Sequence, residues 1–203
     1  MTITLYSGTP GSGKSLHAAR TIRDWLRYKK RPVVANFSIR KPEDWKGDFT
    51  YIRNAEITPE RLLRLSKRVF EETTFREDYI LLVLDECQLL WNSRDWDNPL
   101  RMAWLEFFSQ HRKYGYQVIF IAQDARMIDR QFRSLIEYEI NHRKAGNYGV
   151  FGSILKILAF GELFLAVRYY FPLGDKVGSE WFRYDKKAAS IYDSYALFEK
   201  TGT

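Results

Sequence analysis

The segment Gly8–Ser15 restricts the fold of this chain more than any other feature of its sequence. It reads Gly-Thr-Pro-Gly-Ser-Gly-Lys-Ser and matches the pattern G-x-x-x-x-G-K-[ST] of a phosphate-binding loop. The glycines allow successive backbone N–H groups to curl round phosphate oxygens, and the following helix adds the positive end of its dipole. The loop lies between a β-prone run, Thr2–Tyr6, and a helical pattern that starts at Lys14. That context favours a nucleotide-binding loop over a chance glycine-rich turn.

Every residue of this loop is a predicted contact of the nucleotide, and two of its side chains have specific roles. Lys14 is expected to bridge the β- and γ-phosphates and to act in catalysis, and the Ser15 hydroxyl is expected to ligate Mg²⁺. The cofactors predicted from this segment are ATP and Mg²⁺. The predicted binding residues are Gly8, Thr9, Pro10, Gly11, Ser12, Gly13, Lys14 and Ser15.

A second candidate element is the pair Asp85-Glu86, which ends the apolar run Leu81–Leu84. A strand that is covered on both faces reads as such a continuous apolar run, and its polar end falls at the edge of the sheet. Asp85 is predicted to hold Mg²⁺, directly or through a water molecule. Glu86 is predicted to orient and polarise an attacking water as a general base.

A third candidate is Gln123, which follows the buried-type run Val118–Ala122. A polar residue at the tip of a buried strand can contact the γ-phosphate or the attacking water. We therefore count Gln123 among the catalytic candidates, although a strand-end amide can also simply face solvent.

Strands and helices alternate along the first 145 residues, which predicts an α/β layer fold with a mainly parallel sheet. A helix is expected to open at Thr58-Pro59 and another at Asn98-Pro99, with Gly115 as the C-cap of the second. Short β-like segments follow residue 145 and are expected to add antiparallel strands. The chain is predicted to be one domain, with a core of residues 1–145 and a β-rich segment of residues 146–203. The expected strands are residues 2–6, 32–37, 49–53, 79–84 and 117–122.

Composition excludes several classes of protein. Hydrophobic residues make up 45% of the chain and charged residues 28%, which are ordinary globular values and not those of a disordered or collagen-like chain. The single cysteine, Cys87, cannot form an intrachain disulfide and is expected to be a small buried filler. The net charge of +7 is compatible with an anionic partner such as nucleic acid or a lipid surface, or with simple solubility. The histidines are judged too scattered for a metal site: His17, His111 and His142.

The most apolar stretch, residues 154–173, is not expected to span a membrane. Lys156, Glu162 and Arg168 interrupt it, and three charges make insertion unfavourable. We expect instead a hairpin of Ile154–Phe160 and Leu163–Phe171 joined at Gly161-Glu162.

Three segments in this order resemble one known family. They are Gly8–Ser15 at the N-terminus, Leu84-Asp85-Glu86-Cys87-Gln88, and His111-Arg112-Lys113-Tyr114-Gly115 leading into the run that ends at Gln123. The combination is similar to the zonula occludens toxin (Zot) family, which includes the gene I assembly proteins of filamentous phages. Two later segments, 183–185 and 191–194, resemble the end of that family's cytoplasmic domain.

The resemblance implies a three-layer RecA-like P-loop ATPase that drives assembly and extrusion of filamentous phage at the cytoplasmic face of the host inner membrane. It also implies a homo-oligomeric ring, a hexamer, that acts with phage assembly and coat proteins and with single-stranded DNA or a membrane surface. Members of the family continue into a transmembrane helix and an extracytoplasmic tail, which this sequence lacks. We therefore expect the sequence to be the cytoplasmic domain or a shortened member.

A ring motor of this kind is expected to complete each active site with an arginine from a neighbouring subunit. No arginine lies within Gly8–Ser15 or beside Asp85-Glu86, so the candidates lie elsewhere in the chain: Arg112, Arg130 and Arg133, with Arg126 nearby. Two other hypotheses remain open, a small-molecule kinase built on the same loop and a nucleotide-regulated scaffold with little turnover. The pairing of Asp85-Glu86 with Gln123 argues against a small-molecule acceptor.

Overall fold

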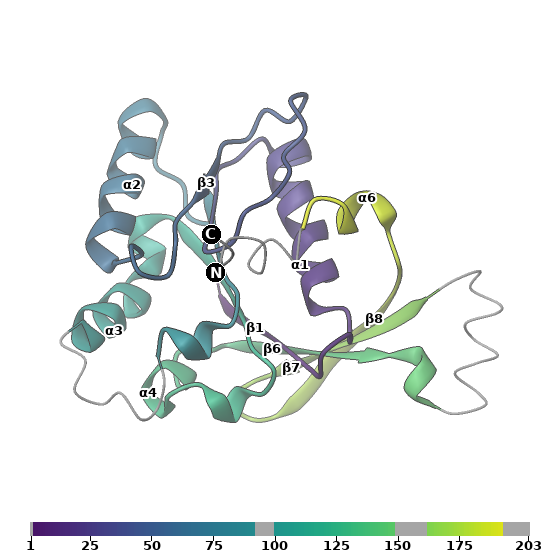
Figure 1. The fold of residues 1–203 in the computed structure, drawn as a ribbon. Coiled ribbons are helices and arrows are strands. Elements are labelled where there is room, and N and C mark those ends of the chain that lie inside the picture. Colours follow the sequence, from purple (N-terminus) through teal and green to yellow (C-terminus); the bar gives the residue numbers. More distant parts are fainter. Residues whose placement is uncertain (1, 92–99, 149–161, 193–203) are drawn as a thin grey trace, which may run out of the picture.

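The computed structural model describes residues 2–91, 100–148 and 162–192, and one eight-stranded sheet runs through them (Figure 1). Its strand order is β3-β2-β4-β5-β1-β6-β7-β8. The first six strands of that order pair in parallel, and β7 and β8 continue the sheet antiparallel. The predicted α/β fold, with a mainly parallel sheet and antiparallel additions near the C-terminus, is confirmed. The strands are β1 (Ile3–Ser7), β2 (Val33–Ala35), β3 (Phe49–Tyr51), β4 (Ile80–Leu84), β5 (Tyr116–Ile121), β6 (Tyr138–Lys144), β7 (Leu163–Tyr170) and β8 (Asp175–Arg183).

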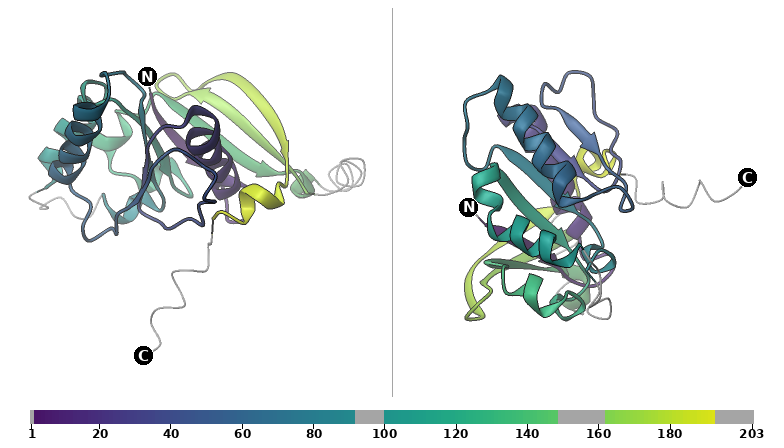
Figure 2. Two further views of the ribbon diagram at one scale, coloured as in Figure 1. Left: turned by 90° about the horizontal axis from the view of Figure 1, so that it is seen from above. Right: turned by 90° about the vertical axis from the view of Figure 1, so that its left-hand side faces the viewer.

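Helices cover both faces of the parallel part of the sheet (Figures 1 and 2). On one face α1 packs through Ala18 and Ile22 against Leu81, Val83 and Ile119. On the other face α2, α3 and α4 bury a cluster rich in aromatic side chains, which includes Trp91, Trp104, Phe107, Phe108, Phe120 and Phe132. The helices are α1 (Lys14–Arg23), continued by the π-helical turn η1 (Asp24–Lys29), then α2 (Pro59–Glu72), α3 (Arg101–Ser109), α4 (Arg130–Arg133) and α6 (Lys186–Ala189), with short 3₁₀ turns η2 (Cys87–Leu89), η3 (His111–Tyr114), η4 (Ala125–Met127) and η5 (Ala145–Tyr148).

A third apolar cluster attaches the C-terminal part of the chain to α1. Leu16 and Ala19 of α1 meet Phe164 and Ala166 of β7, Phe182 of β8 and Ala188 of α6. The short helix α6 is capped by Asp185, whose carboxylate accepts hydrogen bonds from the backbone N–H groups of Lys187 and Ala188. These contacts bring the last described residues beside the start of α1, where the phosphate-binding loop ends.

Local sequence signals explain most of the element boundaries. Thr58 caps α2 as predicted, because its hydroxyl accepts the backbone N–H of Arg61 at 3.2 Å. Gly115 does adopt the left-handed conformation, with φ 73°, but it ends η3 and not α3. Helix α3 ends at Ser109 because the chain tightens into the 3₁₀ turn η3 before reaching the glycine.

The predicted hairpin of the C-terminal segment is only partly within the described residues. Ile154–Phe160 lies outside them, and so do Asn98-Pro99, the predicted start of α3. The described strand β7 pairs along one edge with β6 and along the other with β8. The hairpin that the structure shows is therefore β7–β8, turning at residues 171–174.

Candidate nucleotide-binding site

The loop between β1 and α1 has the shape that phosphate binding requires. Gly8 and Gly13 adopt φ values of 135° and 98°, which residues with side chains rarely adopt. A Cβ atom on Gly8 would lie 2.4 Å from the His142 carbonyl oxygen, and one on Gly13 would lie 2.8 Å from the Phe164 ring. The buried Ser12 hydroxyl has no hydrogen-bond partner among the described residues. A narrow backbone cradle with an unused polar group fits a phosphate ligand.

Lys14 is folded back over this cradle. Its ammonium donates hydrogen bonds to the carbonyl oxygens of Gly8 at 2.6 Å and Thr9 at 3.1 Å. The residue is buried, and burial lowers the pKa of Lys14, while the nearby carboxylates of Glu86 and Asp85 act in the opposite direction. A cation held at the mouth of the loop is placed to neutralise phosphate charge.

Asp85 follows β4 directly, and its position is fixed by the neighbouring strand β2. The Asn36 side chain donates to the Asp85 carbonyl at 2.8 Å and accepts from the Asp85 backbone N–H at 2.7 Å. Burial raises the pKa of the Asp85 carboxyl. Asn36 therefore positions a half-buried carboxylate at the carboxyl edge of the sheet, and the sequence pattern alone did not reveal this contact.

Glu86 has an unusual backbone conformation, with φ 46° and ψ 44°. Left-handed geometry is uncommon outside glycine, and such strain concentrates at functional sites. The Gln88 side chain donates a hydrogen bond to the Glu86 carboxylate. Gln88 is buried and had no role in our prediction beyond the family resemblance, but it orients the predicted general base.

Tyr192 is the residue of the site that sequence reasoning missed. Its hydroxyl donates a hydrogen bond to the Asp85 carboxylate and lies near the Ser15 side chain. Ser15 and Asp85, the two predicted magnesium ligands, therefore face a common point, and hydroxyl and carboxylate oxygens suit Mg²⁺. The family resemblance includes segment 191–194 but assigns Tyr192 no role, because the residue lies more than 100 positions after Asp85 in the sequence.

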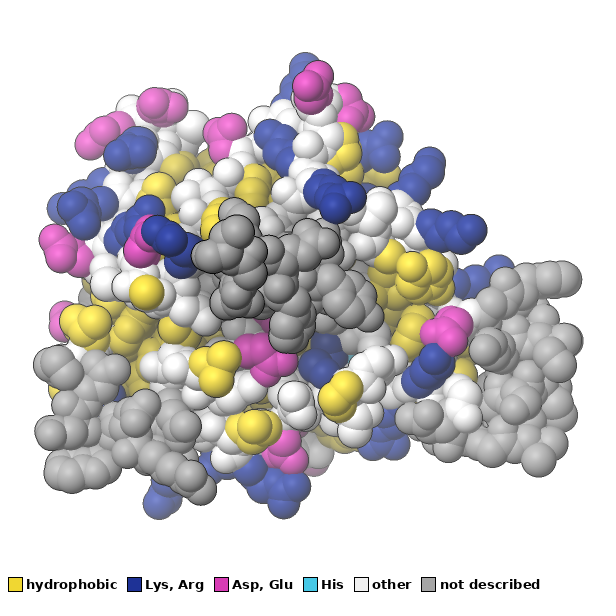
Figure 3. Space-filling model, viewed as in Figure 1, with side chains coloured by type: hydrophobic (Ala, Val, Ile, Leu, Met, Phe, Trp, Pro, Cys, Tyr) yellow, Lys and Arg dark blue, Asp and Glu magenta, His cyan; other side chains and the backbone are white. Residues whose placement is uncertain are grey.

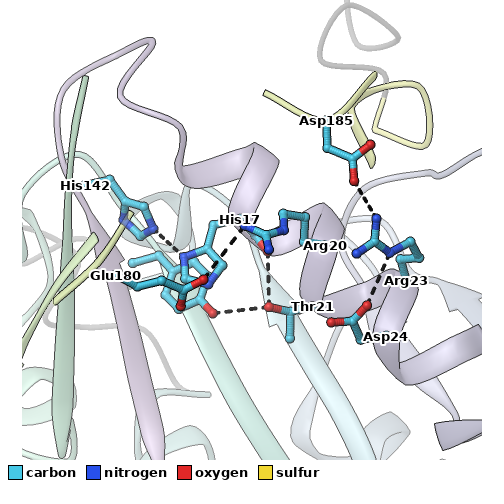
Figure 4. Close-up of polar contacts among 9 residues, drawn as sticks. His17, Arg20, Thr21, Arg23, Asp24, His142, Glu180 and Asp185 are labelled. Atoms are coloured by element: carbon cyan, nitrogen blue, oxygen red, sulfur yellow. Dashed lines mark hydrogen bonds and ion pairs between the residues drawn. The ribbon is translucent and has the colours of Figure 1, made fainter. Parts of the chain in front are cut away.

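The C-terminal segment that carries Tyr192 is anchored on both sides. Arg23 of α1 forms an ion pair with Asp185 at 2.5 Å, as Figure 4 shows. Farther along, the Arg40 backbone N–H donates to the Ile191 carbonyl at 2.9 Å, and Tyr192 forms an antiparallel bridge with Ile39. The Tyr192 ring also packs edge-on against Phe37 at 4.8 Å. Residues 185–192 therefore cross from α1 to the segment that follows β2.

Gln123 lies where the topology predicts. Strand β5 runs between β1 and β4, so its carboxyl end falls between the phosphate-binding loop and Asp85-Glu86. The Gln123 carbonyl accepts the backbone N–H of Gly8 at 3.1 Å. The exposed Gln123 side chain is thus next to the first residue of the loop.

The three arginine candidates lie on two elements outside the loop and the Asp85-Glu86 turn. Arg112 lies on η3, which precedes β5, at the sheet edge opposite to the loop, and its guanidinium is 3.6 Å from the Glu137 carboxylate. Arg130 and Arg133 lie on α4, which packs through Phe132 into the α2/α3 cluster. Their predicted role as fingers for a neighbouring subunit stays a prediction.

His17 and His142 are close together, contrary to the expectation that the histidines are scattered. His17 Nδ1 and His142 Nε2 are 2.8 Å apart (Figure 4). His142 Nδ1 is also 3.2 Å from the Ser7 carbonyl oxygen. The pairing of β6 with β1 brings them together across 125 positions. Burial lowers the pKa of His17 to about 4 and that of His142 to about 3, so both are neutral near pH 7. The pair links α1 to β6, and the described residues form no cluster of three or more metal-ligating side chains.

A cleft with a volume of about 590 Å³ opens beside the loop. Its walls are residues 11–16 of the loop and α1 on one side, and β7 and the C-terminal segment on the other. Pockets of several hundred cubic ångströms are typical of small-molecule and cofactor sites.

Comparison with known proteins shows the family and the fold. The sequence profile described as zonular occludens toxin (Zot) matches residues 2–198. The chain is 37% identical over 86 residues to the Gene 1 protein of Enterobacteria phage I2-2, a match that covers 41% of this chain and 24% of that protein. It is 41% identical over 56 residues to the Gene 1 protein of Enterobacteria phage fd, covering 28% of this chain and 16% of that protein. The matched regions therefore span less than a quarter of the length of these relatives.

Two solved structures share the fold at low sequence identity. The N-terminal domain of zonular occludens toxin from Neisseria meningitidis superposes with a TM-score of 0.64 at 17% identity, covering 95% of this chain and 98% of that one. The DNA-packaging ATPase B204 from Sulfolobus turreted icosahedral virus superposes with a TM-score of 0.57 at 14% identity, covering 90% and 97%. The predicted P-loop NTPase fold is confirmed. Within the described part of the chain, none of the helices combines the length and apolar character needed to cross a bilayer.

Proposed function

Because this chain belongs to the Zot family, we propose that it is a Mg²⁺-dependent ATPase that powers assembly and extrusion of filamentous phage at the cytoplasmic face of the host inner membrane. The observation that carries the proposal is the meeting of four predicted residues at one edge of the sheet. Lys14 covers the loop, Tyr192 lies beside both Ser15 and Asp85, and Glu86 follows directly after Asp85. The similarity to the phage Gene 1 proteins supports the assembly role.

The residues of the chain divide the chemistry between them. The backbone N–H groups of the loop and the Lys14 ammonium bind the phosphates and offset their charge. Ser15 and Asp85 would hold the metal, and a bound Mg²⁺ would neutralise charge on the transferred phosphoryl group. Glu86, oriented by Gln88, accepts a proton from the attacking water, and Gln123 lies beside the loop to sense the γ-phosphate.

The active unit is proposed to be a homo-oligomeric ring, a hexamer by family resemblance. Its sites would be completed by Arg112, Arg130 or Arg133 of a neighbouring subunit, and an arginine finger can contribute about 10³–10⁵-fold in rate. The proposed partners are phage assembly and coat proteins, with single-stranded DNA or the membrane surface as activators. On the face shown in Figure 3, Lys and Arg side chains lie around the rim and mix with Asp and Glu.

The test is phosphate release from Mg²⁺·ATP with no acceptor added, measured over a hundredfold range of protein concentration. We expect turnover whose specific activity rises with concentration, and a further rise with single-stranded DNA or anionic vesicles. Glu86→Gln should bind ATP but hydrolyse it at least about a hundredfold more slowly, which is the scale of general-base catalysis. Glu71→Gln, an exposed change on α2, is the matched control.

Three outcomes would contradict the proposal in distinguishable ways. Phosphate transfer that requires an added small molecule would indicate a kinase. Tight ATP binding without turnover at any concentration or with any activator would indicate a scaffold. Wild-type turnover in Glu86→Gln would assign activation of the water to another residue.

A further inference from the structure

The cleft beside the phosphate-binding loop has two chemically different sets of lining residues. One set is the loop itself, with its backbone N–H groups and Lys14. The other set forms the wall outside the loop and is mostly apolar or aromatic: Leu16, Glu162, Phe164, Tyr184, Ala189 and Tyr192. We propose that this second wall receives the nucleobase, which stacks on the exposed Tyr184 ring; the inference rests on the proposed nucleotide binding.

Continuity of the cavity supports this occupant. A nucleotide held by its phosphates in the loop must place its sugar and base in the adjoining space, and the cleft that contains the loop extends toward β7 and the C-terminal segment. Its volume of about 590 Å³ falls within the usual range for sites that take small ligands and cofactors. Phosphate and base can therefore share one cavity.

Two aromatic side chains in this wall differ in how they are held. Phe164 is buried, contacts the position of Gly13 closely, and stacks on Phe182 with ring centres 5.4 Å apart. Tyr184 is 51% exposed, so its ring is accessible to a ligand in the cleft.

The backbone around Tyr184 is fixed on both sides. Its N–H donates to the Glu162 carbonyl at 2.9 Å, and the next residue, Asp185, pairs with Arg23 of α1 at 2.5 Å. Tyr184 is therefore an exposed ring on an anchored backbone, a surface on which a base can stack with little ordering cost.

The same wall predicts weak selectivity among bases. Stacking recognises the π-face that every base has and reads its hydrogen-bonding edge little. Among the described lining residues outside the loop and α1, Glu162 is the only carboxylate, and it pairs with the Lys144 ammonium at 2.6 Å. We expect ATP and GTP to bind within about tenfold of each other, since a base–aromatic stack contributes to both.

The experiment compares nucleotides with inorganic tripolyphosphate, which has the phosphates but no base. Binding of Mg²⁺ complexes of ATP, GTP and tripolyphosphate would be measured by calorimetry on the wild type and on Tyr184→Ala. Tyr184→Ala should weaken ATP and GTP roughly five- to 150-fold, the range for losing one base–aromatic stack. Its affinity for tripolyphosphate should stay unchanged. Tyr184→Phe should retain wild-type affinity for all three.

Trp181→Ala is the matched control, because Trp181 is also a large exposed ring of the C-terminal strands but does not line the cleft. Equal losses for ATP and tripolyphosphate in Tyr184→Ala would show a distorted loop, and unchanged ATP binding would place the base elsewhere; either overturns the inference. A wild type that binds tripolyphosphate as tightly as ATP overturns it as well. A wild type that binds none of the three refutes the proposed function itself, and this inference falls with it.

Discussion

Tyr192→Phe removes one hydroxyl group from the point that Ser15 and Asp85 share. In the structure the Tyr192 phenol donates to the Asp85 carboxylate and lies near the Ser15 side chain. A metal ion held by Ser15 and Asp85 would occupy the position of the Tyr192 hydroxyl. The phenol must therefore give way when Mg²⁺·ATP binds, and wild-type binding must break a bond that Tyr192→Phe lacks.

The expected magnitude follows from the charge and burial of the acceptor. A hydrogen bond to a charged group contributes about 1.5–3 kcal/mol. Asp85 is half-buried, and this burial raises the pKa of its carboxyl, so solvent replaces the lost donor only in part. The free protein should lose about 1.5–3 kcal/mol of unfolding free energy on substitution, and the metal complex should lose little. By linkage, Mg²⁺·ATP should bind Tyr192→Phe roughly tenfold to a hundredfold more tightly.

Two measurements test the predicted change in stability and the predicted change in affinity. Urea unfolding of the free protein and of the protein saturated with Mg²⁺·ATP gives the two stability differences. Calorimetric titration of Mg²⁺ at a fixed ATP concentration gives the change in affinity for Mg²⁺·ATP. Tyr51→Phe, which removes a hydroxyl from an exposed tyrosine of β3, is the control and should leave both unchanged.

The direction of the affinity change decides the role of Tyr192. Weaker Mg²⁺ binding in Tyr192→Phe would refute competition and would mean that the phenol orients Asp85 in the metal complex. Equal stability losses with and without Mg²⁺·ATP would mean that the phenol does not move at all. Only tighter binding with a smaller stability loss in the complex agrees with the displacement argument.

Three further predictions concern the loop, the buried histidines and the oligomer. Lys14→Ala should nearly abolish Mg²⁺·ATP binding in calorimetry, since phosphate charge would lose its buried counterion, while the exposed-site control Lys67→Ala should bind normally. Because the pKa values of His17 and His142 are depressed to about 4 and about 3, their stabilising contribution is complete above about pH 6.5 and is lost as pH falls. Urea unfolding at pH 5 should therefore show a loss of about 2 kcal/mol for each histidine relative to pH 7.5, a dependence that should weaken in His142→Gln. Glu86→Gln subunits should restore turnover when mixed with a variant that lacks the finger arginine, and no rescue in any pairing would contradict shared sites at Arg112, Arg130 and Arg133.

The parts of the site that the sequence predicts are those whose chemistry is local. The loop Gly8–Ser15 needs its glycines and its lysine at fixed spacing, so the pattern itself contains the physical requirement. Asp85-Glu86 could be located because a strand buried on both faces reads as a continuous apolar run with a polar end. Because β5 lies between β1 and β4 in the parallel sheet, Gln123 at its end lies between the loop and Asp85-Glu86.

Contacts between distant segments left no such signal. Strand β6 reads Tyr-Glu-Ile-Asn-His-Arg-Lys, and this polar sequence does not predict a strand. Its residues are mostly half-buried, and Asn141 and His142 contact Ser7 of β1 in place of packing into an apolar core. The pairing of His17 with His142 depends on that strand and was missed with it.

Tyr192 and Tyr184 are residues of the candidate site whose roles depend on contacts between distant segments. They lie on one short stretch of chain that Arg23 fixes at one end and Arg40 at the other. Both rings line the cleft beside the loop, and the Tyr192 hydroxyl also reaches the predicted metal ligand Asp85. If the base seats against Tyr184 while the metal displaces the hydroxyl of Tyr192, a single segment responds to both ends of the nucleotide. Displacement at Tyr192 would then pull on the bridge to Ile39 and the bond to Arg40, so Arg40 amide exchange should quicken on adding Mg²⁺·ATP and remain slow with ATP alone.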